Sequence, residues 1–146
     1  MRYKRKTGTK TIQSKKGWYD GIKFASQLEI YMYQQLKEND IEFGYEAERF
    51  DLIEAFMSNN VSFERTATKD FINRGEKKIR GIYYTPDFVS DDFIIETKGR
   101  ANESFPIRWK LFKRLLDKNN DMRVIYKPQS KKDCDVVIKE ILKRKQ

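Results

Sequence analysis

The strongest constraint on the fold is a strand–turn–strand pattern in the second half of the chain. Residues 78–88 are predicted to form a strand, residues 90–92 a turn, and residues 93–98 a short apolar strand. So tight a turn makes the two strands antiparallel neighbours. Apolar residues then recur at helical spacing over residues 109–116 and 133–145. These strands and helices can bury their apolar faces against one another, which predicts a single packed α and β core.

The first half of the chain adds a hairpin and a helix to this pattern. Asp20-Gly21 between apolar residues predicts a hairpin over residues 17–24. The motif Ser26-Gln27-Leu28-Glu29 has the spacing of a capping box, which predicts that a helix opens there and ends near residue 39.

A further strand and an excursion complete the expected order. Residues 41–50 alternate apolar and polar side chains, as in a half-buried strand, and this strand is expected to continue through Leu52 and Ile53. Residues 57–77 are polar and are interpreted as an insertion between two strands, with room for a short hairpin. The predicted order is helix, strand, strand, strand, helix, strand, helix. This is an α/β (α+β) fold with a mixed sheet flanked by helices.

Charge is unevenly distributed along the 146 residues, which carry a net charge of +9. Residues 1–16 contain seven basic residues and no acidic ones, residues 127–146 have a net charge of +4, and residues 17–126 have a net charge of −2. We therefore expect a basic N-terminal arm over residues 1–16 and a single domain over residues 17–146. A basic arm beside an acidic body suggests a phosphate-binding tail, although a solvated terminus has the same composition.

Two residue counts exclude several kinds of active site. The chain has no histidine and a single cysteine, Cys134. A Cys/His zinc site, a Ser-His-Asp or Cys-His nucleophile and an internal disulfide are therefore excluded. No apolar run approaches the roughly 20 residues that span a bilayer, and no secretory signal follows the basic N-terminus. We expect a cytoplasmic protein without membrane contact.

The segment with the clearest chemistry is Pro86-Asp87 followed by Glu96-Thr97-Lys98. The antiparallel turn between them is expected to bring Asp87 close to Glu96, and strand alternation puts Lys98 on the face of Glu96. Two carboxylates can hold Mg²⁺, with a carbonyl oxygen from Thr97 as a further ligand. The ammonium group can orient or deprotonate a water, or neutralise charge on a phosphate. Each motif alone also fits an ordinary turn or a strand end with a weak ion pair.

Glu29 is a third candidate acid, with two interpretations that do not exclude each other. The capping box fully accounts for Ser26 and Glu29 as structural residues. Alternatively, Glu29 points from the start of its helix toward the same metal, assisted by Ser26.

Together these motifs resemble the PD-(D/E)XK nuclease superfamily. Within it, the chain is most similar to the phage endonuclease I family of Holliday junction resolvases and to a family of small phage nucleases. The matching segments are Phe24–Glu29, Ile41–Glu46, Tyr84–Phe88 and Glu96–Gly99. The resemblance implies a restriction-endonuclease-like core and a homodimer. The beginning of the chain and residues 57–77 depart from the endonuclease I pattern, which leaves the mode of dimerisation open.

The resemblance also implies roles for individual residues. Asp87 and Glu96 would be metal ligands helped by the Thr97 carbonyl, Lys98 would handle the attacking water, and Glu29 would lie near a second metal. Mg²⁺ is the expected cofactor, and Mn²⁺ can substitute for it. The residues expected to bind DNA are Arg2, Lys4, Arg5, Lys6, Lys15, Lys16, Ser26, Arg100, Lys110 and Lys113.

The leading hypothesis is a Mg²⁺-dependent endodeoxyribonuclease that cuts branched or structured DNA, as a Holliday junction resolvase does. One alternative is a phage nuclease that nicks or cuts linear or mismatched DNA. Another, from a different class, is a non-catalytic DNA-binding module on a nuclease-like fold. An RNA-binding structural protein ranks last, because the aromatic residues show no stacking-platform motif. Cys134 is interpreted as a packing residue near the start of a helix.

Overall fold

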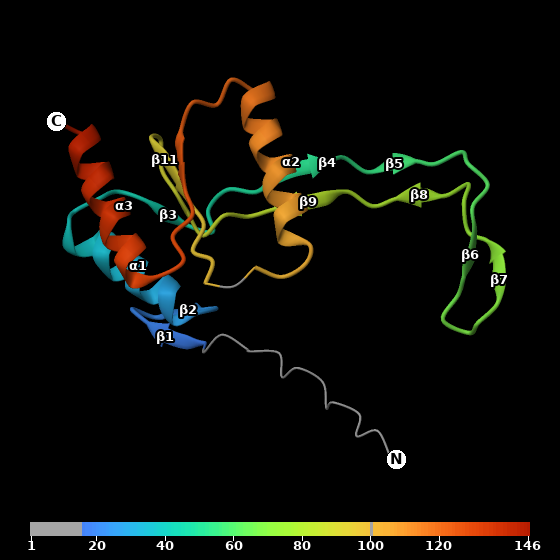
Figure 1. Cartoon of the computed structure of the whole chain (residues 1–146), viewed down its shortest axis with the longest axis horizontal. Helices are drawn as coiled ribbons and strands as arrows, with labels where there is room; N and C mark the ends of the chain where they lie inside the picture. The colour runs from blue at the N-terminus through green and yellow to red at the C-terminus, as the bar shows by residue number, and fades with distance from the viewer. Residues whose placement is uncertain (1–15, 100) are drawn as a thin grey trace, which may run out of the picture. The chain divides into compact units, whose positions relative to one another are not determined.

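The computed structural model describes residues 16–99 and 101–146, and in these residues it confirms the α/β class. The arm predicted over residues 1–16 falls almost entirely outside them. Contacts divide the chain into two compact units. The first comprises Met1–Ile41, described from residue 16 onward, together with Ser130–Gln146, and the second is Glu42–Gln129. Figure 1 shows the elements of both. No helix in the described part of the chain is long and apolar enough to cross a membrane.

The first unit contains the predicted hairpin and two helices. Its elements are β1 (Gly17–Tyr19), β2 (Ile22–Phe24), α1 (Gln27–Glu38) and α3 (Lys131–Arg144). Strands β1 and β2 pair antiparallel, and the turn residues Asp20 and Gly21 both have positive φ, of 53° and 74°. A two-residue hairpin turn of this kind requires that conformation at both positions, and the Asp-Gly pair supplies it at low cost.

Helices α1 and α3 pack against each other around a small apolar core. The buried residues include Met32 and Leu36 from α1 and Cys134, Val137 and Ile141 from α3. The packing role predicted for Cys134 is therefore confirmed. The phenol of Tyr31 also donates a hydrogen bond of 2.6 Å to Asp135 across the two helices.

The second unit is built on a four-stranded mixed sheet in the order β12-β11-β10-β3. Its strands are β3 (Gly44–Tyr45), β10 (Phe88–Val89), β11 (Phe93–Ile95) and β12 (Val124–Tyr126). β10 is antiparallel to both of its neighbours, whereas β11 and β12 are parallel. A parallel pair needs a crossover, and helix α2 (Phe105–Lys118) provides it.

An aromatic cluster joins this sheet to α2. Tyr84 and Phe50 lie with ring centroids 4.7 and 5.0 Å from that of Phe112, which is fully buried. Val89, Ile94, Phe105 and Leu116 complete the cluster, and Trp109 and Leu115 pack at its edge. The predicted apolar face of this helix is therefore its packing face.

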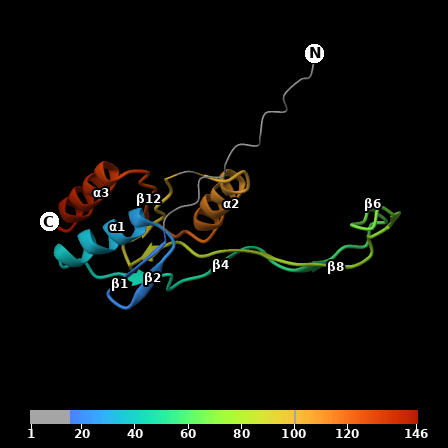
Figure 2. The same cartoon turned by 90° about the horizontal axis from the view of Figure 1, so that it is seen from below.

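Between β3 and β10 the chain forms a long two-stranded ribbon, which consists of three successive antiparallel strand pairs. They are β4 (Phe50–Ile53) with β9 (Ile82–Tyr84), β5 (Phe56–Met57) with β8 (Lys78–Ile79), and β6 (Phe63–Arg65) with β7 (Phe71–Asn73). In both Figure 1 and Figure 2 the ribbon runs away from α2, with β6 and β7 at its far end. We call residues 56–80 the β-arm. It occupies the segment that the sequence predicted as an excursion.

Several predicted elements differ from the observed ones. The strand expected over residues 41–53 is interrupted at Glu46, whose φ of 47° is incompatible with an extended ladder. The strand expected over residues 78–88 is divided at Gly81 and at Pro86. A Cβ at Gly81 would lie 2.7 Å from the carbonyl oxygen of Ile53, and proline has no N–H for the ladder. The apolar residues of the helix predicted over residues 133–145 are not all buried, since Val136 and Leu142 are 55% and 36% exposed.

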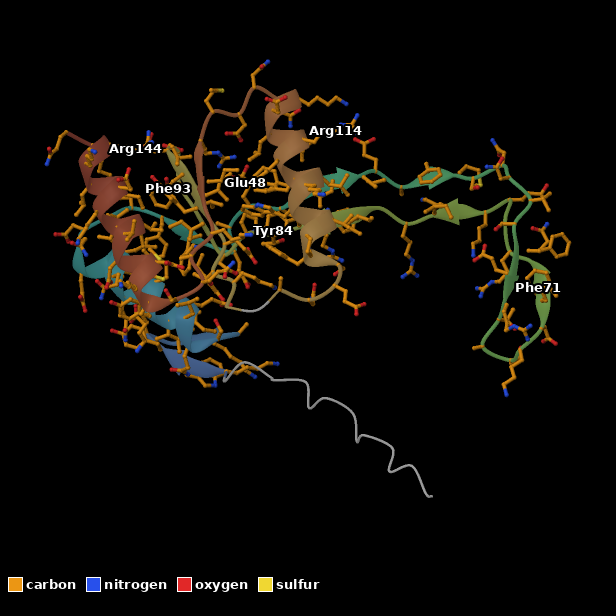
Figure 3. The ribbon with its side chains drawn as sticks, in the orientation of Figure 1. Glu48, Phe71, Tyr84, Phe93, Arg114 and Arg144 are labelled. Carbon is orange, nitrogen blue, oxygen red and sulfur yellow. The ribbon has the colours of Figure 1, made fainter. Side chains whose placement is uncertain are left out.

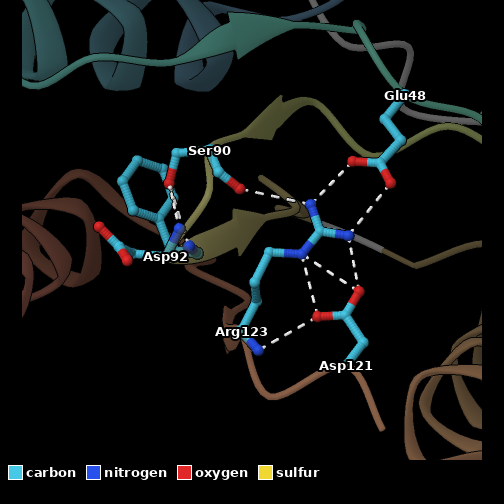
Figure 4. A network of polar contacts seen from close by, with 6 residues as sticks. Glu48, Ser90, Asp92, Asp121 and Arg123 are labelled. Carbon is cyan, nitrogen blue, oxygen red and sulfur yellow. Dashed lines mark hydrogen bonds and ion pairs between the residues drawn. The ribbon is translucent and has the colours of Figure 1, made fainter. Parts of the chain in front are cut away.

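A half-buried arginine fixes the outer end of the β10–β11 hairpin (Figure 4). The Arg123 guanidinium donates to both carboxylate oxygens of Glu48, at 2.7 and 3.1 Å, and to Asp121 at 2.6 Å. It also reaches the carbonyl oxygen of Ser90 in the turn, at 3.3 Å. These bonds hold the pKa of the Asp121 carboxyl below its usual value. The turn is thereby tied to the segment that enters β12.

Candidate active site

The inner end of the β10–β11 hairpin brings two predicted acids together. Phe88 pairs with Ile95 and Val89 with Ile94, so one step farther along the same register Asp87 stands opposite Glu96. Directly opposite residues in an antiparallel pair project to the same face of the sheet. Both side chains are buried, with 8% and 7% of their surface exposed. This register sets the two acids opposite each other at one edge of the sheet.

Hydrogen bonds from Thr97 fix the Asp87 carboxylate. Its Oδ2 accepts one bond from the Thr97 backbone N–H at 2.8 Å and another from the Thr97 hydroxyl at 2.6 Å. The Asp87 carbonyl oxygen also accepts a bond from the backbone N–H of Glu46, at 2.8 Å. Both the backbone and the side chain of Asp87 are thus held in place.

A buried tyrosine orients Glu96. The Tyr84 hydroxyl donates a 2.7 Å hydrogen bond to Glu96 Oε2, and the Glu96 backbone N–H donates to the carbonyl oxygen of Tyr126 in β12. Burial raises the pKa of the Tyr84 phenol, and the charges of Glu96 and Asp87 raise it further. The phenol therefore keeps its proton and remains a donor. Tyr84 lies between α2 and the sheet in Figure 3.

Glu96 and Lys98 open onto one cavity of about 340 Å³. The Lys98 ammonium group lies 4.8 Å from the centroid of the Phe105 ring. The other lining residues are Tyr83, Tyr84, Thr85, Asn102, Ser104, Phe105 and Arg108. The walls therefore carry one carboxylate, two cations and the first turn of α2. The positive charge of Lys98 and Arg108 favours an anion such as phosphate in this cavity.

The sequence did not single out Tyr84 and Arg108 as site residues. Tyr84 precedes Pro86-Asp87 by only two residues, but its contact with Glu96 spans 12 positions and depends on strand pairing. On α2 the sequence predicted Lys110 and Lys113 as DNA-binding residues instead of Arg108. Both lie farther along the helix and are exposed. The start of α2 at Phe105 would have indicated Arg108, because that residue lies in the first turn of the helix.

Glu29 and Ser26 belong to the first unit, where they form the predicted capping box. The Ser26 hydroxyl accepts from the Glu29 backbone N–H at 3.2 Å, and Glu29 Oε2 accepts from the Ala25 backbone N–H at 3.2 Å. The Ser26 hydroxyl also donates to Glu29 Oε1 at 3.4 Å. Glu29 is only 6% exposed. Its structural role at the start of α1 is therefore evident from the geometry.

The donor set at the hairpin suits a hard divalent cation. Mg²⁺ in proteins is commonly held by one or two carboxylates together with waters and substrate phosphates. Asp87 and Glu96 supply two buried carboxylates at the end of the β10–β11 hairpin. Across residues 16–99 and 101–146, no group of three or more His, Cys, Asp and Glu side chains is placed to hold one ion. The remaining ligands would therefore be the Thr97 carbonyl oxygen, waters and substrate oxygens.

The residues predicted to bind DNA lie partly beyond the described chain. Arg2, Lys4, Arg5, Lys6, Lys15 and Arg100 fall outside it. Lys16, Lys110 and Lys113 are described and exposed, and the Lys113 ammonium group lies 5.8 Å from the centroid of the Trp109 ring.

A comparison with family models finds one match, over residues 9–133, to the family described as "Protein of unknown function (DUF1064)". Neither the curated proteins nor the solved structures include a match to the chain.

Proposed function

Since the chain belongs to the DUF1064 family, whose description assigns no activity, we propose from its own site that it is a metal-dependent endodeoxyribonuclease. The observation that carries the proposal is the register that sets Asp87 opposite Glu96 at the end of a hairpin. Lys98 follows two residues later on the same cavity as Glu96. This arrangement supports the PD-(D/E)XK resemblance of the sequence, in which these residues occupy the motif positions.

Each residue has a defined task in phosphodiester hydrolysis. Asp87 and Glu96 would hold Mg²⁺, with the Thr97 carbonyl oxygen as a third protein ligand. The bound ion would lower the pKa of a coordinated water and would stabilise negative charge on the scissile phosphate. Lys98 would orient the attacking water or neutralise the developing negative charge. Arg108 would bind a phosphate of the same strand. Hydrolysis would leave 5′-phosphate and 3′-hydroxyl ends.

We expect the substrate to be branched DNA, cut by a homodimer in the cytoplasm. A junction resolvase must make two cuts related by a two-fold axis, so a symmetric dimer follows from that substrate. Comparing cleavage rates on a four-way junction, a nicked duplex and an intact duplex would distinguish a resolvase from a nuclease that acts on linear DNA.

The deciding experiment is cleavage of these three DNAs by the wild-type protein and by Asp87→Asn. We expect cleavage with Mg²⁺ and none with EDTA. The cleavage rate of Asp87→Asn should fall by about 100-fold or more, because mutating residues that only support metal ligands already lowers activity 10- to 100-fold. Asp91→Asn is the matched control, since Asp91 is an exposed acid in the turn of the same hairpin. Equal rates for wild type and Asp87→Asn would refute the assigned site. Binding without turnover on every DNA would favour a non-catalytic module.

A further inference from the structure

The β-arm has an excess of exposed positive charge that nothing in the described structure neutralises. Residues 56–80 hold six basic and three acidic side chains. The six basic ones are Arg65, Lys69, Arg74, Lys77, Lys78 and Arg80, and all are exposed. None of them forms an ion pair with a described residue, because the salt bridges found there involve only Arg49 and Arg123 as cations.

The three acidic side chains of the arm are instead engaged by neighbouring neutral donors. The bonds run from the Ser62 hydroxyl to Glu64 at 2.8 Å, from the Thr68 hydroxyl to Asp70 at 2.9 Å and from the Asn73 amide to Glu76 at 3.0 Å. The acids therefore serve the local turn structure of the ribbon, while the cations remain available for an external anion.

One face of the outer hairpin combines one of these cations, Arg65, with two aromatic rings. The register pairs Phe63 with Asn73 and Arg65 with Phe71, which places Phe63, Arg65 and Phe71 on the same face. The two rings lie 6.0 Å apart, and 59% and 63% of the surface of these residues is exposed. Phe71 lies at the far end of the ribbon in Figure 3. A two-stranded ribbon has no second layer to cover such rings.

Exposed apolar residues alone would indicate a protein partner. On the β-arm the exposed rings occur together with basic side chains that form no ion pair with a described residue. This combination favours a partner that is both anionic and rich in apolar surface. Nucleic acid meets both conditions, since its phosphates attract lysine and arginine and the thymine methyl groups in the major groove of a duplex offer apolar contact. The width of the major groove of B-DNA also admits a two-stranded antiparallel ribbon.

We propose that the β-arm is a duplex-DNA-binding ribbon, in which the six basic side chains contact phosphates and Phe63 and Phe71 contact base edges in the major groove. The inference deepens the proposed function, since it names the element that grips the same DNA on which the site would act. It also gives a role to residues 57–77, which the sequence predicted only as an insertion between two strands.

The test measures the salt dependence of binding to a fluorescent duplex by anisotropy, with EDTA present so that no cleavage occurs. The full-length variant Arg74→Gln/Lys77→Gln/Lys78→Gln removes three arm cations. The control Lys118→Gln/Lys139→Gln/Lys143→Gln removes three exposed cations from α2 and α3 and changes the net charge equally. We expect the slope of log K against log salt to shrink by about 2 to 3 in the arm variant, and by far less in the control.

A second variant separates the aromatic contact from the charge. Phe63→Ala/Phe71→Ala is expected to weaken duplex binding roughly 10-fold or more at constant salt while leaving the salt slope unchanged. Far-UV circular dichroism of every variant checks that the fold is retained. We expect it to be, because the substituted side chains are exposed.

Equal slopes for the arm and control variants would overturn the proposal. So would a Phe63→Ala/Phe71→Ala variant that binds DNA normally but loses a dimer in sedimentation, because the arm would then join two copies of the chain. The proposed function fails separately: if Asp87→Asn cuts like the wild type while the arm variant lowers the slope, only the assigned catalytic site falls. If the wild-type protein binds no DNA, both proposals fall.

Discussion

At the scale of single residues, the candidate site depends on hydroxyl groups that orient buried carboxylates. Removing an ionised carboxylate from water costs several kcal/mol unless donors replace the lost solvent. Thr97 supplies two donors to Asp87, and Tyr84 supplies one to Glu96. These donors are neutral, so they leave the negative charge available to a cation.

The first residue prediction concerns the Thr97 hydroxyl. Thr97→Val keeps the size and the backbone N–H but removes the 2.6 Å bond to Asp87. We expect the free energy of unfolding to fall by about 1.5–3 kcal/mol, as for other hydrogen bonds to charged groups. Urea denaturation measures it. Thr68→Val is the control, because the Thr68 hydroxyl makes the same kind of bond to Asp70 on the exposed β-arm. A loss no larger than that of the control would contradict the prediction.

A second residue prediction concerns Tyr84 at alkaline pH. The folded-state pKa of this phenol is raised above its usual value near 10, so above pH 10 the unfolded chain releases a proton that the folded chain retains. The stabilisation from Tyr84 is complete below pH 10 and declines as the pH rises above it, by up to about 1.4 kcal/mol per pH unit.

We therefore expect the unfolding free energy of Tyr84→Phe to fall less steeply above pH 10 than that of the wild type. Urea denaturation between pH 9 and pH 11 or so covers the window set by the usual tyrosine pKa. Tyr83→Phe changes an exposed neighbour and should follow the wild-type curve. Identical slopes for Tyr84→Phe and wild type would show that Tyr84 does not retain its proton in the folded protein.

At the scale of elements, the starts of α1 and α3 offer a matched pair. Each helix begins with a serine N-cap whose hydroxyl accepts from the backbone N–H of an acid three residues later. Glu29→Gln and Asp133→Asn therefore make the same kind of change at equivalent helical positions. If Glu29 is the outer acid of the nuclease, Glu29→Gln is expected to lower Mg²⁺-dependent cleavage by about 10-fold or more.

Asp133→Asn is expected to leave that cleavage unchanged, and both variants should lose no more than about 1 kcal/mol of stability. Gel assays of DNA cutting and urea denaturation give the two readouts. Full cleavage by Glu29→Gln would reduce Glu29 to its capping role.

Elements with local signals were predictable from the sequence. The turn at Asp20-Gly21, the capping box at Ser26 and the apolar face of α2 each depend on residues close together in the chain. The β-arm gave no such signal, because a ribbon exposed on both faces does not need alternating apolar residues. The break at Glu46 was also invisible, since its positive φ accompanies a backbone bond to Asp87, 41 residues away.

The candidate site shows the same division. The short turn after Val89 was enough to predict that Asp87 and Glu96 face each other. The donors from Tyr84 and the place of Arg108 on the cavity wall depend on how α2 packs on the sheet. Such contacts combine segments that no local pattern connects.

At the scale of the whole molecule, charge is expected to govern DNA affinity. Residues 1–16 contribute seven of the nine net positive charges. Replacing these seven lysines and arginines by glutamine should reduce the salt slope of duplex binding by up to about 6, if every one meets a phosphate. Anisotropy titrations across a salt series measure the slope. An unchanged slope would mean that the N-terminal cations do not contact DNA in the complex.

The pairing of Phe50 with Tyr84 at the base of the ribbon has a practical consequence. At this pair the ribbon begins and ends, and both residues of the pair are anchored in the aromatic cluster. The β-arm lies farther out, and it can be shortened by whole strand pairs, or its tip exchanged for a short turn, without moving Asp87 or Glu96. Relatives that act on different targets could therefore keep one cutting centre and vary only the reach of this appendage.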